Sequence, residues 1–279
     1  MSMDTGAVYR IIAQSEGTSE DEVRSRYEKG LVNQLGQLNT SENKPTAKAF
    51  LNMAETDFKA SDALYENGLF GASIFHLQQG VEKVSKSIFF LDGMNPNRMA
   101  FNHNIAKLYS DWSNSLNANA RRAHAHHQMQ NEMRTRVVVT SLTCIVQVFI
   151  NSIDPTVDFV TLFSDRNYSL PSYIQDNGSR IRNLASADIQ NLLARAGSIG
   201  NSELGIEGVR AYDDILKNTE KLFTMALLTV AHESTTRYPI GDSLSETYDY
   251  YPALGIVECR ETLIEEARRA STAYYDLIS

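Results

Sequence analysis

The sequence predicts an all-α protein, and three observations support this class. Apolar residues recur at steps of three and four along most of the chain, whereas few stretches alternate with a period of two. The six prolines fall between the periodic segments, where a fixed φ angle and a missing N–H cost least. With 279 residues, 42% of them hydrophobic and 22% charged, the chain is ordinary for a globular protein and can build a large core.

The start of the chain is predicted to form a small helical appendage and a linker, residues 1–44. Thr18 or Ser19, followed by acidic residues, is a suitable N-cap for a helix over residues 20–29. A polar linker follows. The main helical bundle is therefore expected over residues 45–279.

Two helices on either side of the turn-like Glu66-Asn67-Gly68 have the clearest pattern. The apolar face of the first consists of Ala47, Phe50, Leu51, Ala54, Phe58 and Tyr65. In the second helix, apolar residues alternate steps of four and three, which gives a narrow seam suited to antiparallel packing. This seam consists of Phe70, Ile74, Leu77, Val81, Val84, Ile88 and Leu91.

A third helix is predicted from the spacing of Ile105, Leu108, Tyr109, Trp112 and Leu116. A long fourth helix is expected over residues 118–150, polar in its first half and apolar in its second. Its apolar run, residues 137–150, is too short to span a bilayer and contains Ser, Thr and Gln. It therefore predicts a buried helix and no membrane segment.

The rest of the chain is predicted to return to helix after an irregular stretch. Residues 154–183 are poor in periodicity, and a short helix is expected around residues 187–196. Helical spacing resumes over residues 206–230. The last helix is predicted over residues 256–278.

Charge and cysteine content limit the classes of function. The net charge of −8 argues against a protein that coats nucleic acid indiscriminately, although local basic patches could bind RNA. Cys144 and Cys259 have no metal-ligand spacing, so a reduced, cytoplasmic setting is the simplest expectation. The N-terminus lacks the pattern of a signal peptide. No metal and no cofactor is predicted.

Three matches, in a consistent order, resemble the HEPN superfamily of all-helical domains. The first is the hairpin with Asp57, Leu64, Tyr65, Gly68, Ala72, His76-Leu-Gln-Gln-Gly-Val-Glu82-Lys83 and Lys86. The second is His103 at the start of the third helix, and the third is Thr236-Arg237-Tyr238-Pro239 before the last helix.

The resemblance implies a HEPN-like antiparallel helical bundle and several kinds of function. One half of the bundle would come from residues 45–116 and the other from about residue 204 to 279, with a long helical insertion at about residues 117–203. Relatives are linked to RNA cleavage, nucleotide binding and defence, including toxin–antitoxin systems. A homodimer is expected, and a nucleotidyltransferase or another protein is a conceivable partner.

The sequence departs from the catalytic pattern of ribonuclease relatives, which carry an Arg, four to six residues and a His at the start of the last helix. The chain instead has Arg98 and His103, between its second and third helices. Histidine suits proton transfer near neutral pH and arginine suits phosphate stabilisation, so these two are the catalytic candidates. The alternative is that His103 caps a helix and Arg98 is a solvated loop residue.

Further residues are candidates for RNA or nucleotide binding. On the second helix, one stripe opposite the apolar seam holds His76, Gln79, Lys83 and Lys86. Arg121 and Arg122 open the most basic stretch, and Arg237 and Tyr238 lie in the loop before the last helix. An ordinary solvated face is the alternative for each group.

Two functions from different classes follow. The leading one is an RNA- or nucleotide-binding protein with metal-independent ribonuclease activity left open. The alternative is a non-catalytic helical assembly module that binds a protein partner. It is favoured by the acidic net charge and by the absence of the usual Arg and His spacing from the start of the last helix.

Overall fold

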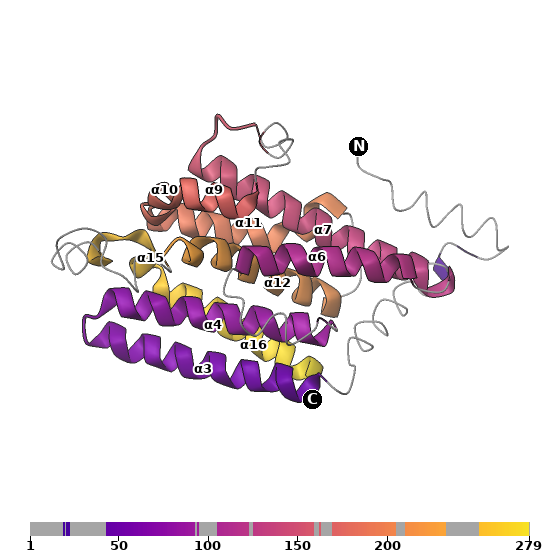
Figure 1. Cartoon of the computed structure of the whole chain (residues 1–279), viewed down its shortest axis with the longest axis horizontal. Helices are drawn as coiled ribbons and strands as arrows, with labels where there is room; N and C mark the ends of the chain where they lie inside the picture. The colour runs from indigo at the N-terminus through magenta and orange to yellow at the C-terminus, as the bar shows by residue number, and fades with distance from the viewer. Residues whose placement is uncertain are drawn as a thin grey trace.

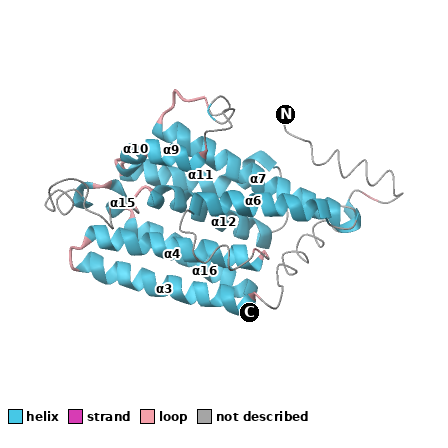
Figure 2. Cartoon of the chain, viewed as in Figure 1, coloured by secondary structure: helices cyan, strands magenta, loops and turns pink. Residues whose placement is uncertain are grey.

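The structure is a computed structural model, and it describes residues 19, 21–22, 43–92, 94, 105–122, 125–158, 162, 169–204, 210–232 and 251–278. Every regular element within these ranges is helical, which confirms the all-α class and agrees with a HEPN bundle (Figures 1 and 2). Of the predicted appendage, the structure describes only a cap, in which the Ser19 hydroxyl accepts a hydrogen bond from the Glu22 amide at 3.1 Å.

The predicted hairpin is confirmed as α3 (Lys44–Glu66) and α4 (Phe70–Leu91). Pro45 lies in the first turn of α3, where its missing N–H would have no helical partner. The turn is a Schellman motif, because Gly68 N–H donates to Tyr65 O and Leu69 N–H donates to Leu64 O, both at 2.9 Å. Gly68 has a φ of +72°, which glycine adopts without the steric cost of a Cβ.

The two helices of the hairpin approach each other most closely at Gly80. A Cβ built there would lie 2.2 Å from a carbon of the Phe58 ring, so only a glycine lets α3 pack this tightly against α4. The hydroxyls of Ser61 and Ser73, at the turn end, each donate to the other residue's carbonyl oxygen at 2.8 Å. The hairpin is thus fixed by both apolar and polar contacts.

The third and fourth helices are α6 (Ile105–Arg122) and α7 (Ala125–Ile153). The expected start of the fourth helix at residue 118 is wrong, because α6 continues to Arg122. No proline or glycine interrupts residues 105–122, so the helix has no local reason to stop earlier. The apolar run over residues 137–150 forms the buried part of α7, as predicted.

The stretch expected to be irregular contains two short helices, α9 (Leu170–Asp176) and α10 (Gly178–Arg182). The Ser169 hydroxyl caps α9 and Pro171 occupies its first turn, a start signal that periodicity does not register. The short helix expected around residues 187–196 is the longer α11 (Ser186–Leu204).

The chain ends with α12 (Arg210–Val230), the 3-10 turn η1 (Tyr251–Ala253), α15 (Gly255–Glu258) and α16 (Arg260–Ile278). In Figure 1, α16 lies behind the hairpin and the C-terminus lies near the start of α3. Helix α4 occupies the centre, in contact with α3, α12 and α16. Leu77 and Val81 of α4 share one hydrophobic core with Ala267 and Tyr274 of α16, so the early hairpin and the last helix close around a common interior.

Buried hydroxyl pairs join the helices that meet in this core. Ser85 and Tyr109 connect α4 to α6 at 3.0 Å, and Thr219 and Tyr274 connect α12 to α16 at 2.9 Å. Burial raises the pKa of Tyr109 and of Tyr274, so both stay neutral hydrogen-bonding groups at physiological pH.

Candidate functional site

A half-buried polar cluster lies between α3 and α4, formed by Asp57, His76 and Lys83, and is here named the His76 cluster. One carboxylate oxygen of Asp57 lies 3.0 Å from His76 Nδ1, and the other accepts a hydrogen bond from Lys83 Nζ. An ionised carboxylate can only accept, so His76 Nδ1 carries the hydrogen and Nε2 is the ring nitrogen left for other partners. The His76 side chain is 32% exposed, so a ligand can reach it.

A second polar chain runs along α4 from Gln79 into the core. Gln79 Nε2 donates to Gln78 Oε1 at 2.6 Å, and Gln78 Nε2 donates to Glu82 Oε2 at 3.4 Å. Glu82 accepts from Lys86 Nζ at 2.7 Å. The partly buried Gln79 is therefore connected, through the buried Gln78, to the buried ion pair of Glu82 and Lys86.

The expected position of Lys86 on a stripe opposite the apolar seam is wrong. Its side chain is only 2% exposed and forms a buried ion pair with Glu82. The cause is the central place of α4, which is covered by α3, α12 and α16 and has no broad solvated face in its second half. The stripe that a ligand can reach is thus reduced to His76, Gln79 and Lys83.

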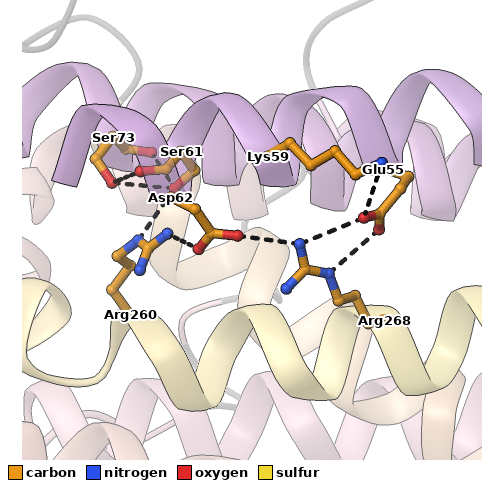
Figure 3. A network of polar contacts seen from close by, with 7 residues as sticks. All are labelled: Glu55, Lys59, Ser61, Asp62, Ser73, Arg260 and Arg268. Atoms are coloured by element: carbon orange, nitrogen blue, oxygen red, sulfur yellow. Dashed lines mark hydrogen bonds and ion pairs between the residues drawn. The ribbon is translucent and has the colours of Figure 1, made fainter. Parts of the chain in front are cut away.

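The last helix is fastened to the hairpin by two arginines that the sequence patterns did not single out (Figure 3). At the start of α16, Arg260 donates to Asp62 and, through Nε, to the Ser61 hydroxyl at 3.2 Å. Its guanidinium also lies 4.8 Å from the centre of the Tyr65 ring. Arg260 is therefore occupied by contacts within the chain.

Arg268 lies two turns further along α16 and extends the same network along α3. Its Nε donates to Glu55 Oε2 at 3.2 Å, and one terminal nitrogen donates to Asp62 Oδ2 at 3.1 Å (Figure 3). Partial burial lowers the pKa of Arg268, but the hydrogen bonds to Glu55 and then to Asp62 outweigh this and raise the pKa overall. The network is a permanently charged clasp between α3 and α16.

A buried histidine marks the end of α12. His232 is 1% exposed, and its Nδ1 lies 3.5 Å from the Tyr251 hydroxyl. Burial, and then the charge of Arg182, lower the pKa of His232 to about 3. It is a neutral structural residue, and the ring of Tyr251 packs beside it.

Several predicted site residues fall outside the side chains that the structure describes. Arg98, His103, Arg237 and Tyr238 lie outside the described ranges, and their roles stay predictions. Arg121 and Arg122 form the last turn of α6, but their side chains are not described. The expected catalytic and loop residues are thus neither brought together nor separated by the structure.

Asp57 is the site residue to which the sequence patterns gave no role. In an antiparallel hairpin, residues at equal distances from the turn face each other, and the turn at Gly68 places Asp57 opposite the segment from His76 to Lys83. Counting outward from the turn would have found this pairing. Arg260 and Arg268 had no such signal, because their partners lie about two hundred positions away in the chain.

Among the described residues there is no metal site, no membrane-spanning helix and no disulfide. No group of His, Cys, Asp and Glu side chains there could hold a metal ion. None of the helices within the described ranges is long and apolar enough to cross a membrane. Cys144 and the buried Cys259 are not joined in a disulfide.

Comparison with known proteins finds a family match for part of the sequence. Residues 47–135 match the family model described as the HEPN domain, a family associated with RNA binding and ribonuclease activity. No curated protein and no solved structure matches the chain. The matched segment covers α3, α4, α6 and the first part of α7, and contains every predicted site residue except Arg237 and Tyr238. The chain therefore contains a HEPN domain, at residues 47–135.

Proposed function

We propose that the protein binds RNA through its HEPN domain, with the accessible side of α4 as part of the binding surface. The observation that carries this proposal is the His76 cluster, in which an accessible imidazole and a lysine come to one place on the domain. Gln79 lies between them on the same side of the helix and can add a hydrogen bond.

The charge of the cluster limits its share of the affinity. The Lys83 ammonium and the Asp57 carboxylate offset each other, so only a protonated His76 gives the cluster a net positive charge. An RNA phosphate would therefore gain little there from electrostatics alone. Most of the binding energy is expected from the predicted basic stretch that begins at Arg121 and Arg122.

A binding measurement tests this proposal. The affinity for a fluorescently labelled single-stranded RNA is measured by anisotropy over a series of salt concentrations, for the wild type and for Arg121→Gln, Arg122→Gln and Lys83→Gln. A variant that removes one phosphate contact should have a salt slope smaller by roughly 0.7. Lys59→Gln is the matched control, because Lys59 is 74% exposed on α3 and its ion pair with Glu55 spans 4.0 Å.

The proposal requires the arginine variants to bind more weakly than the control and with a smaller slope. Wild-type protein that binds no RNA at moderate salt contradicts it, as does equal weakening in all four variants. Free nucleotides are tested on the same protein by thermal shift, where a bound nucleotide raises the melting temperature.

A second candidate, a non-catalytic assembly module for a protein partner, has its own support. Lys86, Arg260 and Arg268 are all neutralised by carboxylates within the chain, and the net charge is −8. Purification from native cells distinguishes the candidates, since a stoichiometric protein without nucleic acid favours assembly. A nucleotidyltransferase in that role would suit a toxin–antitoxin system. The homodimer stays a prediction, tested by light scattering.

A further inference from the structure

We propose that the His76 cluster is a phosphate-binding site that forms only when His76 is protonated, so that RNA binding there takes up a proton. The ligand is one phosphodiester group of the RNA backbone, which carries a negative charge. This inference rests on the proposed RNA binding and adds to it a dependence on pH that the geometry of the cluster imposes.

Asp57 fixes the tautomer of the neutral His76 ring. Its carboxylate oxygen lies 3.0 Å from Nδ1 and can only accept, so the one N–H of the neutral imidazole is on Nδ1. Nε2 then carries a lone pair and is itself an acceptor. A phosphate oxygen is also an acceptor, so the neutral ring offers it no hydrogen bond at Nε2.

A proton added at Nε2 changes both the hydrogen bonding and the charge of the cluster. Nε2–H becomes a donor on a side chain that is 32% exposed, and a charge-assisted hydrogen bond to phosphate is stronger than a neutral one. Because Lys83 and Asp57 offset each other, the added proton gives the cluster a net positive charge. Histidine is the side chain that ordinarily changes charge between pH 5 and 8.

No other described group near His76 replaces this proton. The charged groups that face the ring are Asp57, from α3, and Lys83, from its own helix, which is only 16% exposed and donates to Asp57. The helices α15 and η1, which also contact α4, contain no basic residue. On α16 and α12, three cations near the hairpin and core are held by carboxylates, namely Arg260, Arg268 and Lys221.

The carboxylate that fixes the tautomer is itself held in place. Lys83 donates to the second oxygen of Asp57, so both oxygens have partners. Gly80 lies between His76 and Lys83 on α4, and its missing Cβ admits the ring of Phe58, the residue after Asp57. The close packing of α3 against α4 therefore keeps the acceptor beside Nδ1, and the neutral ring cannot turn its N–H toward a ligand.

Two substitutions separate the proton from the hydrogen bond. In His76→Gln, the amide can donate to phosphate at any pH, so no proton is needed. In Asp57→Asn, the new amide can donate to Nδ1 of His76, which leaves the N–H of the neutral ring on Nε2. Asp57→Asn also leaves Lys83 without its counter-charge. Both variants should therefore bind RNA at pH 8 at least as well as the wild type.

The test measures affinity and proton uptake on the full chain. Anisotropy with a labelled single-stranded RNA gives the affinity at pH 6, 7 and 8, at constant ionic strength, for wild type, His76→Gln, Asp57→Asn and the control Lys59→Gln. Calorimetry at pH 7 in two buffers of different ionisation enthalpy gives the number of protons taken up per RNA. Circular dichroism at each pH checks folding, and the other histidines are unchanged in every variant.

The wild-type affinity should rise as the pH falls, and more steeply than that of His76→Gln. The difference between the two profiles is expected to reach up to about tenfold for each pH unit, the limit for one linked proton. Wild type should also take up more protons than His76→Gln, by up to one. Asp57→Asn should lose the same pH dependence, and Lys59→Gln should keep the wild-type profile.

The opposite results are distinguishable from failure of the proposed function. Wild type that binds RNA with the same pH profile and proton uptake as His76→Gln overturns the inference and leaves RNA binding intact. Variants that weaken binding equally at every pH also overturn it, because they show a purely structural role. A wild-type profile in Asp57→Asn removes the fixed tautomer as the cause. Wild type that binds no RNA at either pH 6 or pH 8 removes the proposed function as well.

Discussion

Arg260 and Arg268 belong to one polar network but should contribute differently to stability, because they differ in burial. Both arginines donate to Asp62, yet the Arg260 side chain is 8% exposed and that of Arg268 is 38% exposed. An ion pair near water is screened and contributes little, whereas removing one partner of a buried pair leaves a desolvated group without compensation. The residue at the start of α16 is therefore the stronger half of the clasp.

Truncation to alanine should lower the free energy of unfolding more at Arg260 than at Arg268. Arg260→Ala is expected to lower the free energy of unfolding by about 2 kcal/mol, less than for a fully buried pair because Asp62 is partly exposed and keeps Arg268. Arg268→Ala is expected to cost about 0.5–1 kcal/mol. Urea unfolding at pH 7 measures both. An equal or larger loss for Arg268→Ala would show that the clasp depends on the exposed end.

His232 should make stability fall in mild acid. Its pKa has the ordinary value of 6.5 in the unfolded chain and is about 3 in the folded protein, so below pH 6.5 the unfolded chain binds the extra proton. The contribution of the neutral His232 to the free energy of unfolding is therefore fully present above pH 6.5 and is lost as the pH falls toward 3. From pH 7.5 to 5 the loss from this residue is about 2 kcal/mol.

The variant His232→Gln isolates this effect, because the carboxylates that also titrate are unchanged. Urea unfolding at pH 7.5 and at pH 5 gives the loss of stability for each protein. Wild type should lose about 2 kcal/mol more than His232→Gln over this interval. Equal losses would mean that His232 is protonated without cost and is not held neutral by its surroundings.

Among the helices, the α3–α4 hairpin was the most predictable part of the fold, whereas the helices that cover its polar residues could not be predicted. The apolar stripes and the Asn67-Gly68 turn are local signals, and α3 and α4 begin and end close to where these signals place them. The boundary between α6 and α7 was missed by a few residues because polar and alanine-rich sequence contains no stop signal there. Likewise, Lys86 is buried because α4 is covered by α12 and α16, which lie far along the sequence. The spacing of residues on α4 alone does not reveal these contacts.

Helix packing in the hairpin should depend on Gly80. In Gly80→Ala the new methyl group would meet the Phe58 ring, so α3 has to move outward or Phe58 has to leave its position. The expected cost is about 1–3 kcal/mol despite the better helix propensity of alanine. Because Asp57 adjoins Phe58, the contact between Asp57 and His76 should also weaken.

Gly71→Ala is the matched control on the same helix. A Cβ there lies 3.4 Å from the Tyr251 ring, an ordinary contact, so the substitution should be neutral or stabilising by up to about 1 kcal/mol. Thermal unfolding compares the two variants with the wild type. A Gly80→Ala protein as stable as Gly71→Ala would mean that the hairpin is loosely packed.

At the scale of the whole molecule, the predicted insertion contributes to the same interior as the HEPN domain. Helices α7 and α11 pack against α12, which in turn contacts α4 and α16. Gly255 also lies so close to the backbone of residues 184–186 that a Cβ there would be 2.4 Å from the Leu184 carbonyl oxygen. The domain and insertion limits stay predictions, but the described helices share one core.

A shared core predicts one cooperative unfolding transition for the full chain. Trp112, the single tryptophan, is buried in α6 and reports the domain by fluorescence, while far-ultraviolet circular dichroism reports all helices. The two probes should give the same urea midpoint and slope, because α4 cannot lose its cover from α12 and α16 independently of them. A fragment of residues 47–135 lacks both of these helices and should not unfold cooperatively. Separate midpoints in the full chain, or a fragment as stable as the full chain, would instead show that the HEPN domain folds alone and that the later helices only rest upon it.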